Sequence, residues 1–319
     1  MAEVQKIATR ESYGKALVAL GHAQPALVVL DADLSEATKT AGFAEAFPDR
    51  FFNCGIAECN MMAVAAGLAS CGLVPFASTF AMFAAGRAFE QVRNSIGYPH
   101  LNVKIGATHG GISVGEDGAS HQCAEDFALM RAIPGMVVIC PADDVEARAA
   151  VAAAYAHEGP VYLRFGRLAT PVFHAPESYG FSIGKGELLR PGTHMTIIAN
   201  GLLVYEALQA ATALAAQGID ARVINMATIK PLDEAMVLAA ARETGRILTC
   251  EEHNIIGGLG EAVCALTAGQ CPVSVMRLGI NDEFGHSGPA PALLQQFGLC
   301  AEGIVRMAAQ LMQSPRPTA

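Results

Sequence analysis

Apolar positions along the chain fall into short runs that are separated by stretches of helical period. In the first half these runs are ALVVLDAD, VPFASTF, LNVKIGAT, MVVICPA and PVYLRFG. In the second half they are MTIIANG, ARVINM, RILTCEE and PVSVMRLGI. Strand-length runs that alternate with helical segments predict mostly parallel sheets covered on both faces. We therefore expect an α/β protein with two doubly wound domains, each a mostly parallel sheet flanked by helices.

Proline and glycine mark a boundary between the two alternations. Residues 168–192 include ATPVFHAPESYG and RPGTH, which indicate a linker with a short hairpin. We expect an amino-terminal domain over residues 1–167 and a carboxyl-terminal domain over residues 193–319, joined by this linker. The length of 319 residues suits two compact units.

Composition narrows the classes of function. Aromatic residues make up only 6% of the chain and hydrophobic residues 52%, so the apolar mass is aliphatic and suits helices packed on a buried sheet. A net charge of -9 argues against a nucleic-acid or anionic-membrane surface.

The apolar runs are too short to span a bilayer and the first residues lack a signal-peptide core, so we expect a cytoplasmic location. The nine cysteines include no CxxC pair, and we assign neither a disulfide nor a metal site.

A polar, glycine-rich loop follows the run LNVKIGAT. Ligands of open parallel sheets bind beyond the carboxyl ends of the strands, where this loop is expected to lie. Its polar residues are His109, Glu116, Asp117, His121 and Gln122. Asp117 and His121 could hold the hydroxyls of a polyol or relay a proton, with His109 as a second imidazole. The alternative is a turn satisfied by its own side chains, and we favour the functional interpretation.

An acid and two aromatic residues lie near the ends of other strands. Glu58 falls in the first turn of the helix that follows FFNC. It either complements the positive end of that helix or forms an acid in an apolar pocket that shares a proton with a ligand nitrogen. Chemistry alone leaves both interpretations open. Phe80 and Phe83 have the spacing of core aromatics, although the strand end where they fall makes a ligand platform the alternative.

Three arginines lie near the ends of expected elements: Arg10, Arg164 and Arg167. Arg164 ends the run PVYLRFG, where its guanidinium could hold a phosphate group. Taken alone, each of the three is typical of a surface charge.

The order of motifs resembles a known family. The motifs are ATRESYGKAL, DADL, GIAECNM, STFAMF, ATHGGISVGEDGASHQ, PADD, PVYLRFGR and EEHNIIGGLGEAV. In this order they resemble the carboxyl-terminal half of transketolase and, more widely, the thiamine-diphosphate enzymes that include 1-deoxyxylulose-5-phosphate synthase. The resemblance covers nearly all of residues 5–310, and GEDGASHQ together with GIAE is highly specific.

The resemblance implies roles at the cofactor. Glu58 matches the catalytic glutamate that hydrogen-bonds the aminopyrimidine ring of thiamine diphosphate. Phe80 and Phe83 match aromatics that pack on this ring, and Asp33 of DADL matches a residue near the cofactor.

The resemblance also implies roles at the substrate. His109 and His121 match catalytic residues that face the ketose, and Asp117 matches a residue that binds its hydroxyls. Arg10 and Arg164 match residues that grip the sugar phosphate, and Arg167 is a weaker candidate for the same role.

The chain departs from the family pattern at several positions. The usual THDS is THGG and GEDGPTHQ is GEDGASHQ, while Gly86 replaces an aromatic residue and Ala37 a serine near the phosphate. The chain also contains no GDG sequence. The family binds the diphosphate and its divalent metal, Mg or Ca, through GDG on an amino-terminal domain. We therefore expect a partner subunit that carries GDG, self-association through this chain and a heterotetramer.

The expected activity is that of the second subunit of a split transketolase, which transfers a two-carbon ketol unit from a ketose phosphate to an aldose phosphate. One alternative is a condensation that starts from pyruvate, which GIAE and AFEQV favour. A subunit of a 2-oxo acid dehydrogenase fits GEDGASHQ less well. A non-catalytic scaffold subunit is a further alternative, and a regulatory nucleotide-binding protein is disfavoured because no GxGxxG follows the first strand.

Overall fold

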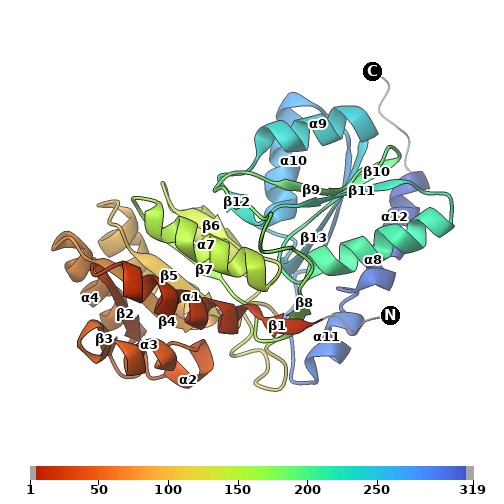
Figure 1. Cartoon of the computed structure of the whole chain (residues 1–319). Helices are drawn as coiled ribbons and strands as arrows, with labels where there is room; N and C mark the ends of the chain where they lie inside the picture. Colours follow the sequence, from red (N-terminus) through yellow and green to blue (C-terminus); the bar gives the residue numbers. More distant parts are fainter. Residues whose placement is uncertain (1–4, 314–319) are drawn as a thin grey trace.

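Two α/β units lie side by side in the computed structural model, which describes residues 5–313 (Figure 1). The strands of the first unit are β1 (Lys6–Ala8), β2 (Leu27–Asp31), β3 (Phe51–Asn53), β4 (Val74–Phe80), β5 (Lys104–Thr108), β6 (Val137–Ile139), β7 (Val161–Arg164) and β8 (Ala169–Pro171). Its α-helices are α1 (Thr9–Ala23), α2 (Ser35–Thr38), α3 (Ala41–Ala46), α4 (Glu58–Ser70), α5 (Phe89–Gln91), α6 (Asp126–Arg131) and α7 (Asp144–Ala156). A 3-10 turn (Pro48–Arg50) and two π-helices (Met82–Arg87 and Val92–Gly97) complete it.

The second unit begins in the expected linker. Its strands are β9 (Glu187–Arg190), β10 (Met195–Ala199), β11 (Ala221–Asn225), β12 (Thr228–Lys230), β13 (Arg246–Asn254) and β14 (Ser274–Ile280). Its helices are α8 (Leu203–Ala216), α9 (Glu234–Thr244), α10 (Leu259–Gln270), α11 (Ala290–Gln296) and α12 (Ala301–Gln313). Every apolar run that the sequence analysis identified therefore contains a strand.

The two main sheets are mostly parallel, which confirms the predicted fold class. The first has the strand order β12-β6-β7-β5-β4-β2-β3, and the second has the order β14-β13-β10-β11-β9. One edge strand of each sheet is antiparallel to its neighbour, β12 to β6 and β9 to β11. β12 belongs to the second half of the sequence and completes the first sheet, so the chain crosses back between the units.

The hairpin expected within residues 168–192 does not form. β8 pairs with β1 in a separate antiparallel ladder, and β9 joins the edge of the second sheet. β9 thus covers an edge of the second sheet that a local hairpin would leave open, while β8 and β1 pair their backbone groups with one another. The segment is a strap between the units, and its exact boundaries stay a prediction.

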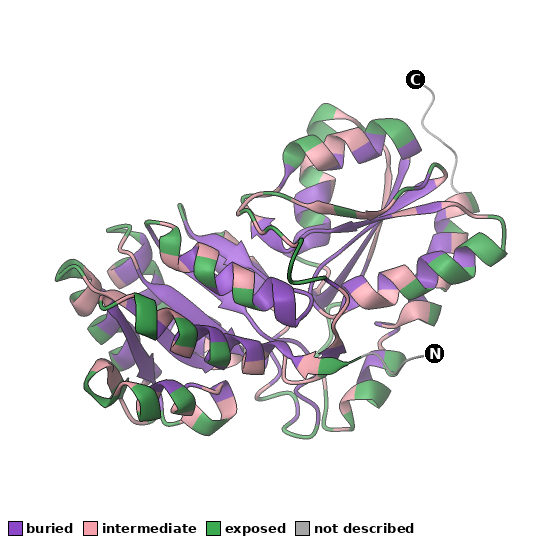
Figure 2. Ribbon diagram, in the orientation of Figure 1, coloured by how far each residue is buried: buried purple, intermediate pink, exposed green. Residues whose placement is uncertain are grey.

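A continuous core joins the two units. Met61 and Phe127 of the first unit belong to the same buried apolar cluster as Ile224, Val237 and Leu259 of the second. The inner strands β2, β5, β7 and β10 are buried throughout, whereas the edge strands β3 and β9 are partly exposed (Figure 2). A shared core fixes the units against one another and so fixes the loops between them.

Buried charges add to this junction. Arg164 reaches Asp126 at 3.3 Å and donates to the backbone oxygens of Cys123 and Glu252 at 3.2 and 2.8 Å. The Glu252 carboxylate in turn accepts from the backbone N–H of Ser113 at 2.6 Å. Because these contacts join β7 and the glycine-rich loop to β13, the second unit positions that loop directly.

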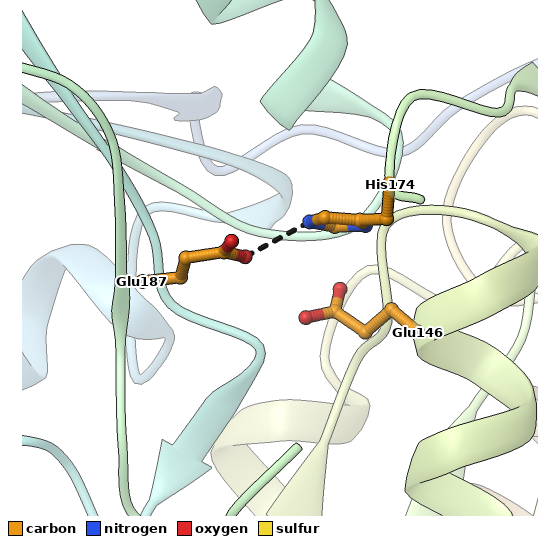
Figure 3. A group of neighbouring side chains, drawn as sticks. All are labelled: Glu146, His174 and Glu187. Carbon is orange, nitrogen blue, oxygen red and sulfur yellow. Dashed lines mark hydrogen bonds and ion pairs between the residues drawn. The ribbon is translucent and has the colours of Figure 1, made fainter. Parts of the chain in front are cut away.

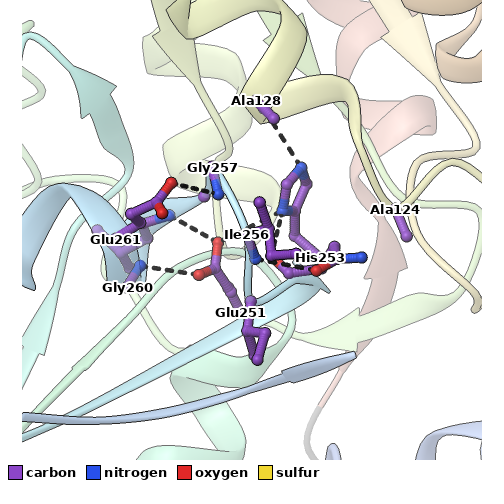
Figure 4. A network of polar contacts seen from close by, with 12 residues as sticks. Ala124, Ala128, Glu251, His253, Ile256, Gly257, Gly260 and Glu261 are labelled. Carbon is purple, nitrogen blue, oxygen red and sulfur yellow. Dashed lines mark hydrogen bonds and ion pairs between the residues drawn. The ribbon is translucent and has the colours of Figure 1, made fainter. Parts of the chain in front are cut away.

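Glu251 and His253 of β13 contact the helices around them (Figure 4). Glu251 accepts from the backbone N–H groups of Leu259 and Gly260 and so caps α10, while burial raises its pKa to about 7. The His253 ring stacks on Phe127 at 4.8 Å, and burial lowers its pKa to about 4. Both groups are therefore structural parts of the junction.

A second buried group ties the strap to both units (Figure 3). His174 of the strap lies 3.0 Å from Asp143 and 2.9 Å from Glu187, so its imidazole lies between one carboxylate of each unit. Glu146 of α7 lies beside it and accepts from Tyr179 of the strap and from Asn225 of β11. We call Asp143, Glu146, His174 and Glu187 the strap cluster.

Two further expectations concern membranes and cysteines. Within residues 5–313 no helix combines the length and the apolar character that a bilayer span requires. All nine cysteines fall in this range and are free.

Candidate active site

Two rings meet where neighbouring strands end. Phe80 is the last residue of β4 and pairs in register with Thr108, the last residue of β5. His109, the next residue, therefore lies beside Phe80, and their ring centroids are 3.8 Å apart at an interplanar angle of 28°. His109 has a φ of 58°, a left-handed conformation that is uncommon for a residue with a side chain. Such backbone strain is typical of functional sites.

Phe83 and His121 complete an aromatic cluster with Phe80 and His109. Phe83 stacks on Phe80 with centroids 5.8 Å apart. The His121 ring meets Phe83 edge-on at 5.4 Å and Phe80 at 6.3 Å. Four residues that were selected from two segments of the sequence are thus in contact, with Phe80 buried and Phe83 partly exposed, and the ligand-platform interpretation stays a prediction.

The His109 imidazole is neutral. Arg10 Nη1 lies 3.1 Å from Nε2, and a guanidinium can only donate, so Nε2 accepts. Nδ1 then carries the proton and donates to the Thr108 hydroxyl at 2.8 Å. Burial and then the charge of Arg10 lower the pKa of His109 to about 3. The ring therefore remains a neutral hydrogen-bonding group through the physiological pH range.

Positive charge surrounds His109. Besides Arg10, the charges of Arg167 and Lys39 help to lower its pKa. Arg10 also donates to the carbonyl of Ala37 at 3.0 Å, which holds its guanidinium against the loop after β2. We call Arg10, Lys39 and Arg167 the basic group. Arg10 contacts the neutral imidazole and the charges of Lys39 and Arg167 act on it from farther away, so this part of the site offers positive charge to an anion although the whole chain is acidic.

Buried Asp31 holds the loop that carries Lys39. Its carboxylate accepts from the backbone N–H of Leu34 at 2.6 Å and from the hydroxyls of Thr38 and Thr40 at 2.7 and 2.9 Å. Burial raises the pKa of Asp31. This network fixes the direction of the loop toward α1 and therefore the place of Lys39.

Asp117 and Arg167 lie at the outer part of the glycine-rich loop. Arg167 Nη1 lies 3.8 Å from Asp117 and 3.5 Å from Glu116, and it also donates to the carbonyl of Val114. Gln122 has a different place, because its amide donates to three backbone carbonyls, those of Ile112, Gly115 and His286. Gln122 therefore shapes the loop.

Glu58 is buried at the first turn of α4, next to the aromatic cluster. Its side chain is 2% exposed and accepts from Arg87 Nη1 on both oxygens, at 2.9 and 2.8 Å. The Arg87 guanidinium lies over the Phe83 ring at 4.4 Å from the centroid. Glu58, Arg87 and Phe83 thus form one contiguous group. Glu58 is therefore not a solvated helix-end acid, but its partner is the Arg87 guanidinium and not an apolar pocket, and its role at a cofactor stays a prediction.

Two predicted residues lie apart from this group. Arg164 points to the junction described above and is buried, so its part in phosphate binding stays a prediction. Asp33 follows β2 at the same edge of the sheet, where it is exposed and accepts from Asn53 at 3.2 Å. Its place near a cofactor also stays a prediction.

Sequence reasoning missed Arg87, Lys39 and Glu252. A buried carboxylate requires a cation, so the isolation of Glu58 among uncharged neighbours was a signal for a partner such as Arg87. The glycines of THGG were a signal for Glu252. A Cβ atom at Gly111 would lie 2.2 Å from the Glu252 carboxyl carbon, so only a glycine leaves room for this acid.

Family models match the two units. Residues 5–172 match the model described as "Transketolase, pyrimidine binding domain", and residues 184–304 match "Transketolase, C-terminal domain". Two relatives match over most of their length. A protein of Methanocaldococcus jannaschii, described provisionally as a transketolase C-terminal section, is 50% identical over 93% of this chain and 94% of its own. The 6-deoxy-6-sulfo-D-fructose transketolase subunit of a Clostridium species is 42% identical over 95% and 94%.

Solved structures agree with this assignment. A structure described as "Split gene transketolase, inactive beta4 tetramer" has a TM-score of 0.90 and 53% identity, and the match covers 96% of this chain and 98% of that one. The transketolase of Leishmania mexicana has a TM-score of 0.80 and 28% identity, and the match covers this whole chain but only 47% of the enzyme. The chain thus has about half the length of a full transketolase.

Proposed function

The chain belongs to the transketolase family as the carboxyl-terminal subunit of a split enzyme, and from this premise we propose that it transfers ketol units together with a partner subunit. The proposed reaction moves a two-carbon ketol unit from a ketose phosphate to an aldose phosphate, with thiamine diphosphate as cofactor. The observation that carries the proposal is the buried Glu58 carboxylate beside the aromatic cluster.

The residues of this chain fit the pyrimidine part of thiamine diphosphate. A buried carboxylate provides a partner for a ring nitrogen, and the Phe83 face over which Arg87 lies could receive a flat heterocycle. Buried Phe80 stacks on His109 and Phe83 and supports that ring. Bound thiamine diphosphate supplies a carbon nucleophile and an electron sink. We propose that Glu58 holds a proton at the pyrimidine, while His109 and His121 hydrogen-bond the ketose. In this scheme Asp117 binds its hydroxyls.

The basic group supports a substrate with an anionic tail. Arg10 lies beside His109, and the charges of Lys39 and Arg167 act on the same ring. Two relatives are named for anionic or phosphorylated sugars, the 6-deoxy-6-sulfo-D-fructose transketolase subunit and an apulose-4-phosphate transketolase subunit from Phocaeicola vulgatus, which is 38% identical over 96% of this chain. Phosphate and sulfonate share the oxyanion that such a group binds. We propose a phosphate as the tail.

A partner subunit is part of the proposal. The chain has no GDG sequence, so we propose that the partner binds the diphosphate and its metal, Mg or Ca. Apolar side chains lie exposed near Glu58, with Ile56 79% and Val64 of α4 38% exposed. We propose that the partner covers them in a heterotetramer. We also propose that this chain alone self-associates without activity, since its 53% identical relative is described as an inactive beta4 tetramer.

The test uses this chain reconstituted with a GDG-containing partner, an aldose phosphate as acceptor, and ketose phosphates, a neutral ketose or pyruvate as donor. Glu58→Gln should lower kcat by about 10²- to 10⁴-fold, the usual effect of removing a proton-transfer group. Glu234→Gln is the matched control, because Glu234 is the exposed first residue of α9. It removes an acid from a helix start without touching the site.

The rival functions give different results in this assay. A scaffold subunit predicts that Glu58→Gln leaves the activity unchanged. A pyruvate-dependent condensation predicts product from pyruvate and an aldose phosphate without a ketose donor. Either result would refute the proposed ketol transfer. A cytoplasmic location also stays a prediction.

A further inference from the structure

We infer that Arg87 closes the cofactor-facing side of Glu58 in the free subunit and has to leave before thiamine diphosphate can bind. Arg87 would then set how readily the subunit accepts the cofactor. The inference rests on the proposed function, because it takes Glu58 as the carboxylate that meets the pyrimidine.

Arg87 engages both groups that the pyrimidine would need. Its Nη1 atom donates to both oxygens of Glu58, at 2.9 and 2.8 Å. Its guanidinium lies 4.4 Å from the centroid of Phe83, over the face of that ring. A flat heterocycle that stacks on this face and reaches Glu58 would have to take the place of the guanidinium. The two arrangements therefore exclude each other.

The arginine is placed so that it can leave. Its side chain is 47% exposed while that of Glu58 is 2% exposed, so withdrawal returns the guanidinium to water. Arg87 ends a π-helix, Met82–Arg87, a rare form that often occurs at functional sites. The pair also satisfies a buried carboxylate that would otherwise be costly in the free subunit. Arg87 thus protects the site before assembly.

A closed site lowers the apparent affinity for the cofactor. When only a fraction of the molecules is competent to bind, the apparent Kd rises by the inverse of that fraction. Removal of Arg87 should therefore tighten the binding of thiamine diphosphate. Removal of a residue that instead helped to hold the cofactor would weaken the binding. The direction in which the Kd changes therefore distinguishes a gate from a binding residue.

The first experiment measures the Kd of thiamine diphosphate with Mg²⁺ by calorimetry on the reconstituted complex. Arg87→Gln should bind about fivefold more tightly, the scale expected for loss of a half-exposed ion pair. An unchanged or weaker affinity would overturn the inference.

Arg148→Gln is the matched control for this experiment. Arg148 of α7 is 50% exposed and pairs with Asp144, which is 3% exposed, so the two pairs have nearly the same burial. Arg148 lies on a helix that the site does not use. Its replacement should leave the affinity for thiamine diphosphate unchanged, and an equal gain in both variants would count against a gate at Glu58.

The second experiment needs no cofactor. In the isolated full chain, Arg87→Gln should lower the melting temperature because it leaves Glu58 buried without a partner. Glu58→Gln should suppress most of this loss in the double variant. Strictly additive changes would show that the two side chains are not coupled in solution and would contradict the inference.

Failure of the inference can be told from failure of the proposed function. If Glu58→Gln abolishes the activity while Arg87→Gln does not tighten cofactor binding, the function stands and the gate is wrong. If Glu58→Gln changes neither the activity nor the affinity for thiamine diphosphate, the proposed function itself is wrong.

Discussion

Two ion pairs bury a carboxylate in the amino-terminal unit, and they differ in how the arginine is held. At the junction, Arg164 and Asp126 have side chains that are 4% and 0% exposed, and the guanidinium also donates to two backbone carbonyls. At the candidate site, Glu58 is equally buried but Arg87 is 47% exposed. The two carboxylates are alike in burial, whereas the two guanidinium groups differ in their exposure to solvent.

This difference separates an enclosed charge from one that solvent can reach. The Arg164 guanidinium is enclosed by the second unit, so no ligand can replace it without opening the junction. The Arg87 guanidinium faces solvent on one side, so the site can exchange it for another partner at small cost. Burial of an acid alone is therefore a weak sign of function. An exposed partner does not mark function by itself either, since Arg148 and Asp144 show nearly the same exposures away from the site. The aromatic rings beside Glu58 and Arg87 are therefore the distinguishing feature.

The strongest test of this comparison removes the enclosed arginine. Arg164→Met should lower the free energy of unfolding of the full chain by about 3–5 kcal/mol, because it leaves the Asp126 carboxylate buried without its cation and with the Tyr162 hydroxyl as its hydrogen-bond donor. Urea unfolding measures the change, with Arg148→Met as a control that should cost about 1 kcal/mol or less. A similar small cost for both variants would mean that the junction pair is as replaceable as a surface pair.

A second test places a side chain where the Glu252 carboxylate lies at the junction. Gly111→Ser restores the residue found in THDS, but Gly111 has a φ of 79° and its Cβ would meet the Glu252 carboxylate at 2.2 Å. We expect a loss of about 2–3 kcal/mol from backbone strain and displacement of Glu252. Gly269→Ala is the control, since a Cβ there meets nothing within 4 Å. Equal stability of both variants would show that Glu252 has room to move.

The smallest expected effect concerns pH and the strap cluster. Burial alone would lower the pKa of His174, but its hydrogen bonds to Asp143 and Glu187 and the charge of Glu146 raise it to about 9. The folded value exceeds the ordinary value of 6.5, so the stabilisation is complete below about pH 6.5 and is lost as pH rises through 9. We expect about 2 kcal/mol over this window, allowing for solvent near Glu187.

Chemical unfolding at pH 6 and pH 9 measures this prediction, and His174→Gln provides the comparison. The wild-type chain should lose stability across the interval by about 2 kcal/mol more than the variant does. Parallel curves for the two proteins would show that the strap imidazole does not hold its proton through the carboxylates around it.

Much of the candidate site could be predicted because strand order and register act on it directly. Phe80 and His109 follow neighbouring parallel strands, so the rule that ligands bind at carboxyl strand ends brings their rings together. The fold class also follows from the alternation of apolar runs. In both cases a pattern in the local sequence is enough to predict how the segments are arranged in the fold.

The remainder depends on contacts between segments far apart in sequence. Arg87 lies 29 positions from Glu58, and a π-helix, which no local pattern announced, directs it there. Arg164 ends a strand as predicted, but the second unit decides that it faces Asp126 and Glu252. The expected hairpin does not form for the same reason, because β8 and β9 pair with β1 and β11, which lie far from them in the sequence.

The crossing of β12 limits how this molecule can be divided. Thr228 and Lys230 pair with Ile139 and Val138, so a fragment cut after residue 172 would expose the backbone of β6 as an open sheet edge. Unpaired edges of apolar strands invite association with other chains. A shortened protein intended to display the aromatic cluster alone would need a substitute strand at that edge, supplied by a grafted segment or by a designed cap.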